Sequence, residues 1–243
     1  MTEMGSPKAK SLFSSYFPLS SQLGFIFLFA SSIFCTLVVR KGGPVSGEVE
    51  ITRWMSENSP AFIELFHDVS DPLLTDIAAP IVFAVLVLVV WIFWGRFSAI
   101  ILGFAGACTA LTRIGDLVNR PRPTSDGQWM AYSFGNGGYP SGHVIFTVLV
   151  FGTIWTLSTS NVSSRVSKWI ARSVLLLIIL TCWSRISELE HWPLDVVGGL
   201  CMSAAALIVI VSVNKNLPEL LKGDSSLGRL LGLTELSSRE QSA

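Results

Sequence analysis

The chain has 243 residues, of which 50% are apolar and 14% are charged, and its formal net charge is zero. Soluble domains carry about 25% charged residues, so this composition argues against an ordinary soluble globular protein. The basic residues form no stripe or arm of the kind that binds nucleic acid, so we expect no nucleic-acid partner.

Apolar stretches long enough to cross a membrane recur along the chain. We expect an all-α integral membrane protein, with six transmembrane helices packed in one bundle. The expected spans, in chain order, are 18–39, 77–95, 97–117, 141–159, 166–185 and 193–213. All four cysteines fall inside these spans without metal-ligand spacing, which is typical of small packing residues.

The segments outside the spans complete a single membrane domain covering 1–243, with its core at 77–213. Residues 47–72, between the first two spans, place apolar side chains at helix-like spacing, which predicts short amphipathic helices on the membrane surface. Residues 1–16 and 214–243 are polar and are expected to form tails.

Basic residues indicate how the bundle is oriented. Most Lys and Arg residues outside the polar clusters described below fall on the side of the two termini. Cytoplasmic loops carry an excess of such residues, so the termini are expected in the cytoplasm. The opposite face is then extracytoplasmic or lumenal.

Three polar clusters interrupt the apolar pattern, at 120–123, 140–143 and 184–195. The first follows the third span, the second opens the fourth, and the third joins the fifth to the sixth. With six spans, all three clusters lie on the extracytoplasmic face. This shared position makes one common site more plausible than three unrelated polar loops.

The second cluster reads Pro140-Ser141-Gly142-His143. Serine is a favoured N-cap residue, and the first-turn amides of a helix attract anions. Gly142 allows a phosphate to approach the backbone closely, with His143 beside it. The alternative is a plain helix start with an incidental histidine.

The third cluster contains Ser184, Arg185, His191 and Asp195. Asp195 follows His191 by four residues, so its carboxylate is expected to hold one imidazole nitrogen and leave the other free to attack. Arg185 is placed to hold phosphate oxygens. The alternative is a polar loop with an N-capping aspartate.

The first cluster is Arg120-Pro121-Arg122-Pro123. Its prolines end the third span and stiffen the backbone, which limits the movement of both arginines. Guanidinium groups are well suited to phosphate oxygens. The alternative is a helix stop whose arginines contact lipid headgroups.

These residues resemble the type 2 phosphatidic acid phosphatase superfamily over roughly 77–213. The family pattern is Lys-x6-Arg-Pro, then Pro-Ser-Gly-His, then Ser-Arg-x5-His-x3-Asp, and the second and third blocks are complete here. The first block departs from the pattern. If Arg122 is its arginine, the lysine position falls on Gly115; if Arg120 is, it falls on Arg113, which keeps the charge.

The resemblance implies catalysis without a metal or other cofactor. His191 attacks phosphorus and forms a phosphohistidine, Asp195 orients it, and His143 protonates the leaving group and then activates water. Phosphate oxygens are held by a set of cationic and polar groups. This set is Arg122, Arg185, Ser141 and Gly142, with Arg120 and Arg113 as further candidates.

The implied activity is the dephosphorylation of a membrane lipid phosphate or diphosphate, with the bilayer as its environment. Polyprenyl diphosphate, phosphatidylglycerophosphate and phosphatidate all remain open as substrates. Gly115 favours the alternative, a non-catalytic membrane protein that binds or transports lipid phosphates. His67 matches nothing in the pattern, and the sequence predicts no oligomeric state.

Overall fold

The computed structural model describes residues 18–75, 77–118, 120–124 and 137–220, and these residues form helices and loops without any strand. In chain order the elements are α2 (Leu19–Val39), α3 (Glu48–Glu57), α4 (Ala61–Ser70), α5 (Ala78–Trp94), α6 (Arg96–Cys108), the 3₁₀ turn η1 (Thr109–Ile114), α7 (Gly115–Val118), α8 (Gly142–Phe146), the π-helical turn η2 (Thr147–Phe151), α9 (Gly152–Asn161), α10 (Ser164–Ser187) and α11 (Pro193–Leu220).

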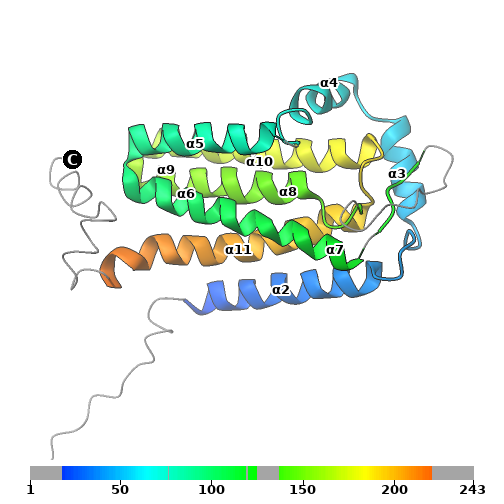
Figure 1. Cartoon of the computed structure of the whole chain (residues 1–243), viewed down its shortest axis with the longest axis horizontal. Coiled ribbons are helices and arrows are strands. Elements are labelled where there is room, and N and C mark those ends of the chain that lie inside the picture. The colour runs from blue at the N-terminus through cyan, green and yellow to red at the C-terminus, as the bar shows by residue number, and fades with distance from the viewer. Residues whose placement is uncertain (1–17, 76, 119, 125–136, 221–243) are drawn as a thin grey trace, which may run out of the picture.

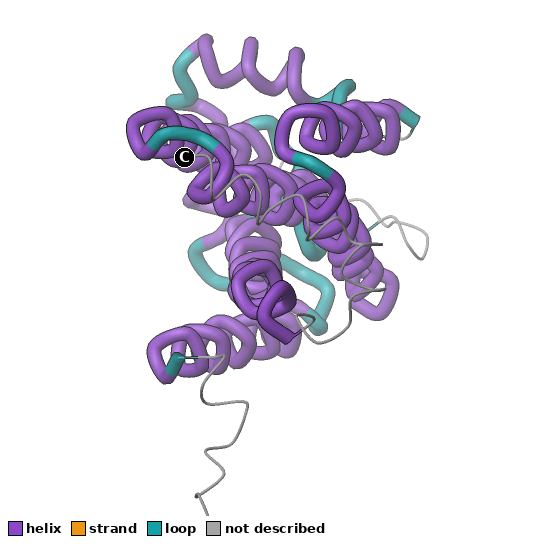
Figure 2. The backbone as a smooth tube through the Cα atoms, turned by 90° about the vertical axis from the view of Figure 1, so that its left-hand side faces the viewer, coloured by secondary structure: helices purple, strands orange, loops and turns teal. Residues whose placement is uncertain are grey.

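The long helices run side by side and alternate in direction (Figure 1). The α5–α6 turn lies at one end of the bundle, whereas α3, α7 and the loop before α11 lie at the other. Viewed along the helices, α2 is at the edge of the bundle (Figure 2), where it packs on α11. This alternation brings the ends that carry the three polar clusters together.

Apolar composition explains the bundle. Among the described residues, five helical segments are long and apolar enough to cross a membrane, and the one expected span that falls short, α5, is apolar but only 17 residues long. Apolar side chains on the outside of the bundle, such as Phe27, Ile92 and Leu175, are exposed, as suits lipid contact. Several apolar helices of this kind indicate an integral membrane protein.

Two expected spans are not regular α-helices throughout. The third tightens into η1 after Cys108, and the fourth is interrupted by η2 between α8 and α9. The last helix continues to Leu220, beyond the end of the expected span at 213 and into the segment predicted as a polar tail. The predicted tail at 1–16 and the rest of the C-terminal tail lie outside the described residues.

The two short amphipathic helices predicted between the first two spans are confirmed as α3 and α4. Both expose large apolar side chains, among them Trp54 and Leu65. The ring of Trp54 lies 6.3 Å from that of Trp183 on α10, and the Trp183 indole N–H donates to the Ser59 hydroxyl at 3.2 Å. These contacts hold the α3–α4 segment against the end of α10.

Candidate active site

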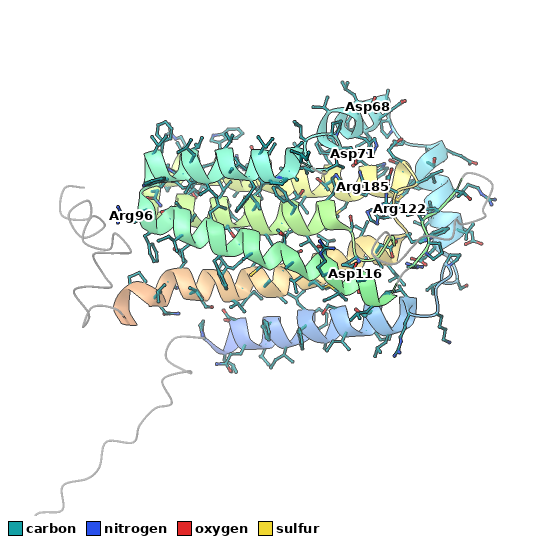
Figure 3. The ribbon with its side chains drawn as sticks, viewed as in Figure 1. Asp68, Asp71, Arg96, Asp116, Arg122 and Arg185 are labelled. Carbon is teal, nitrogen blue, oxygen red and sulfur yellow. The ribbon has the colours of Figure 1, made fainter. Side chains whose placement is uncertain are left out.

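A cavity of about 240 Å³ opens at the end of the bundle where the polar clusters meet. All three clusters border it, through Arg122, through Gly142 and His143, and through His191. Figure 3 shows Arg122 and Arg185 at this end and Arg96 at the far end. The alternating helices therefore bring segments far apart in sequence to one concave surface.

Backbone hydrogen bonds join the clusters. The Gly138 N–H donates to the Arg120 carbonyl at 2.5 Å, and the Ser141 N–H donates to the Asp195 carbonyl at 3.1 Å. The Trp192 indole N–H donates to the Pro121 carbonyl at 2.9 Å. The relative positions of the clusters are thus fixed by the main chain as well as by side chains.

His191 is buried in the loop that precedes α11. Its Nδ1 lies 2.5 Å from the Gly138 carbonyl oxygen, which accepts a hydrogen bond from an Nδ1–H and leaves Nε2 as the unprotonated nitrogen. Burial, followed by the nearby charges of Arg185 and Arg122, holds the pKa of His191 well below its usual range. The ring is therefore neutral at neutral pH.

The hydrogen bond expected between Asp195 and His191 is not formed. Asp195 Oδ2 is 3.9 Å from His191 Nδ1 and instead accepts from the Trp192 N–H at 2.8 Å. Its Oδ1 accepts from Arg120 Nη1 at 2.7 Å. The Gly138 carbonyl is therefore the partner of His191 Nδ1, and the Asp195 carboxylate compensates the charge of buried Arg120.

Arg120 is not placed to bind phosphate, contrary to one expectation. Its side chain is fully buried, and its guanidinium is engaged by Glu48, Asp195 and the Gly43 carbonyl. It also lies over the Trp192 ring at 5.9 Å. Because every side of the group is occupied, Arg120 acts within the protein rather than on a ligand.

Glu190 links the two other cluster arginines. Its carboxylate pairs with Arg122 and lies 3.2 Å from Arg185 Nη2. Arg122 borders the cavity, whereas the Arg185 side chain is almost fully buried and is not among the described cavity-lining residues. Arg185 therefore pairs with Glu190 and Asp71 outside the cavity lining.

His143 lies in the first turn of α8 and borders the cavity. Its Nε2 lies 3.3 Å from Asp71 Oδ1, and Arg185 Nη1 lies 2.5 Å from the same oxygen. Burial opposes the charged form of Asp71, but the hydrogen bond and charge of Arg185 outweigh it and lower the pKa of Asp71. Asp71 is therefore an anion that joins His143 to Arg185.

Ser141 is the N-cap residue of α8, as predicted, but its hydroxyl makes no capping bond. The side chain is fully buried, and its Oγ has no partner. Next to it, Gly142 borders the cavity. An unpartnered hydroxyl at this position is free to donate to an anion entering beside Gly142.

The lysine position of the family pattern is closed at Gly115. A Cβ built on Gly115 would overlap the Tyr139 carbonyl oxygen, so the helix and the 137–140 segment approach too closely for any side chain there. Arg113 borders the cavity, but its side chain is 80% exposed and lies 3.8 Å from Asp116. Arg113 is thus a cation of the cavity rim.

Sequence reasoning found Asp195 but missed the other carboxylates that contact the cluster residues. Glu190 stood next to His191 and was visible within the third cluster, but Asp71 and Glu48 carry no local signal in a mixed surface segment. His67, which matched no pattern, lies close enough for its charge to help lower the pKa of Asp71, after Arg185 and His143. In the described part of the chain, no group of three or more His, Cys, Asp or Glu is arranged to hold a metal ion.

Comparison with known proteins assigns the family. A family model described as the PAP2 superfamily matches residues 94–219, more than half of the chain. The chain belongs to the PAP2 superfamily. Comparison with curated proteins and with solved structures gave no significant match.

Membership in the PAP2 superfamily indicates phosphatase activity on phosphate esters. The matched segment contains all the residues of the three polar clusters. Asp71 and Glu48 precede it, so two carboxylates that contact cluster residues come from outside the matched segment.

Proposed function

We propose that this PAP2 protein removes phosphate from a lipid phosphate or diphosphate at the extracytoplasmic face of a membrane. One observation carries the proposal. His143, His191 and Arg122 border a single cavity at the end of an apolar helical bundle. A lipid substrate keeps its tail in the bilayer while its phosphate occupies such a cavity.

The proposed reaction runs through a phosphohistidine. Nε2 of neutral His191 attacks phosphorus, and the ester P–O bond breaks as the N–P bond forms. The electron pair goes to the leaving oxygen, which takes a proton from His143. Water then attacks phosphorus and gives its proton to His143, while the N–P bond breaks and its electron pair returns to Nε2.

The surrounding groups stabilise charge on the transferring phosphoryl group. Arg122 contacts its oxygens directly, and Arg185 adds positive charge from outside the cavity lining. The free hydroxyl of Ser141 and the backbone at Gly142 supply neutral donors. Fixed groups of this kind aimed at developing charge are usually the largest contribution to the rate.

The test measures phosphate release by the protein purified in detergent, with a chelator present. The panel contains phosphatidate, phosphatidylglycerophosphate and a polyprenyl diphosphate. His191→Ala should abolish release, because it removes the atom that bonds to phosphorus. Reactions with a radiolabelled phosphoryl group, quenched in alkaline detergent because the N–P bond is acid-labile, should carry label on the wild type and none on the variant.

Two outcomes contradict the proposal. Wild-type activity in His191→Ala would show that His191 is not the nucleophile. A wild type that binds lipid phosphates but is inert on the whole panel supports the alternative, a lipid-phosphate binder or transporter. The closed lysine position at Gly115 is the observation that favours this alternative.

A further inference from the structure

Asp71 approaches the site from outside the family-matched segment. It follows α4 directly, and its Oδ1 lies 2.5 Å from Arg185 Nη1 and 3.3 Å from His143 Nε2. Figure 3 shows Asp71 and Arg185 near each other at the site end of the bundle. Nothing in the three-block motif assigns a role to this carboxylate.

The contact with Asp71 is made by one nitrogen of His143, Nε2. Nε2 is buried and has no hydrogen-bond partner, so the Asp71 carboxylate is the group that compensates a proton there. The ring borders the cavity, and Nδ1 is its other nitrogen. A carboxylate beside one imidazole nitrogen favours the proton on that nitrogen and makes the other the acceptor.

Asp71 does not occupy the place of the phosphate. The described residues that border the cavity include His143 and His191 but not Asp71. The His143 ring thus meets both the cavity and the Asp71 carboxylate, which is outside the cavity lining. This arrangement fits a group that supports the ring from behind rather than one that a ligand displaces.

We propose that Asp71 is a positioning residue for His143: its carboxylate holds the ring through Nε2, so that Nδ1 exchanges the proton with the substrate. The inference rests on the proposed function. Before the first step the ring is an imidazolium with protons on both nitrogens, and its Nδ1 proton passes to the leaving oxygen as the P–O bond breaks. In the second step a water proton returns to Nδ1 and restores the imidazolium, which the Asp71 carboxylate stabilises through Nε2.

The test compares Asp71→Asn with wild type on two substrates that differ in leaving group. Phosphatidate releases an alkoxide, which needs a proton, whereas p-nitrophenyl phosphate releases a stabilised phenolate, which does not. We expect kcat/KM on phosphatidate, which reports the steps up to loss of the leaving group, to fall by about tenfold or more, part of the ~10²–10⁴-fold that a positioned general acid contributes. On p-nitrophenyl phosphate, kcat/KM should change little.

Three further variants separate positioning from folding. Asp68→Asn removes an exposed carboxylate from α4, the helix that Asp71 follows, and should match wild type on both substrates. Asp71→Glu keeps the charge and should recover part of the loss on phosphatidate. In a His143→Ala background, Asp71→Asn should cost nothing more, because a positioning residue has no effect without its partner.

The outcomes separate the two proposals. Equal losses of kcat/KM on both substrates in Asp71→Asn, or a further loss in the His143→Ala background, would overturn the role of Asp71 alone, with the phosphatase intact. A wild type inert on both substrates and on the lipid panel overturns the proposed function, and the role of Asp71 falls with it.

Discussion

Gly115 shows how a single position changes the charge of the site. The family pattern has a lysine seven residues before the arginine of the first cluster, and here that position abuts the Tyr139 carbonyl. No side chain fits there, so the cations nearest the cavity are Arg122, Arg185 outside the cavity lining, and Arg113 on the rim. The centre of this site therefore carries less positive charge than a site that has the lysine of the family pattern.

Adding even a methyl group at Gly115 should destabilise the protein. Gly115→Ala forces the helix away from the Tyr139 carbonyl, and overpacking of this kind costs about 1–3 kcal/mol. Thermal unfolding in detergent measures the loss. Gly103→Ala is the matched control, because a Cβ on Gly103 meets no atom within 4 Å. Equal melting temperatures for the two variants would contradict the close approach.

At the scale of elements, the buried ion network of Arg120 links a surface helix to a span. Glu48, the first residue of α3, pairs with Arg120 and accepts from the Leu194 N–H at 2.9 Å in the first turn of α11. Asp195 completes the network from α11. The α3 helix thus helps to hold the start of the helix that follows His191.

Breaking this network should destabilise the fold. Glu48→Gln leaves buried Arg120 with one carboxylate instead of two, and removing one partner of a buried pair costs about 3–5 kcal/mol. Chemical unfolding in mild detergent should report the loss. Glu50→Gln, on the exposed face of the same helix, is the matched control and should leave stability unchanged. Equal stability of both variants would show that Asp195 alone compensates Arg120.

Most elements were predictable because apolar run length governs them. The expected spans, the two short helices and the start of α8 after Ser141 follow from apolarity and capping. The end of α11 was not predictable from these signals, since residues beyond the apolar run remain helical to Leu220. Local turns such as η1 and η2 also lie beyond what hydrophobic periodicity indicates.

The sequence predicts which cluster residues gather at the site, but not which hydrogen bonds and ion pairs these residues make. Motif spacing predicts which residues gather, whereas hydrogen-bond partners depend on how distant segments pack. Asp71 and Arg185 are 114 residues apart in the sequence. The Gly138 carbonyl took the role expected of Asp195 because backbone position at 137–140 is fixed by tertiary contacts that spacing does not encode.

At the scale of the whole molecule, the two ends of the bundle differ in chemistry. The site end carries buried charge, and the other end carries the short turns near Arg96 and Ser163. The excess of basic residues on the side of the turns leads us to expect that end in the cytoplasm. The site then faces away from the cytoplasm.

Cysteine labelling in intact cells tests this orientation. In a chain whose four cysteines are replaced by alanine, Lys41→Cys at the site end should react with a membrane-impermeant maleimide. Arg165→Cys at the other end should react only after the membrane is permeabilised. Both positions are exposed, so access across the membrane decides the result. The reverse pattern would place the site in the cytoplasm.

Tyr139 gives the first span a part in the chemistry. Its hydroxyl lies 2.8 Å from the Thr36 hydroxyl on α2, and its ring lies so close to Gly198 on α11 that a Cβ there would overlap it. The preceding residue, Gly138, supplies the carbonyl that orients His191. Tilting or removing α2 would leave the Tyr139 hydroxyl without its partner in an apolar environment. The segment that holds the Gly138 carbonyl against His191 would then be less firmly fixed, so α2 contributes to the site as well as to the bundle.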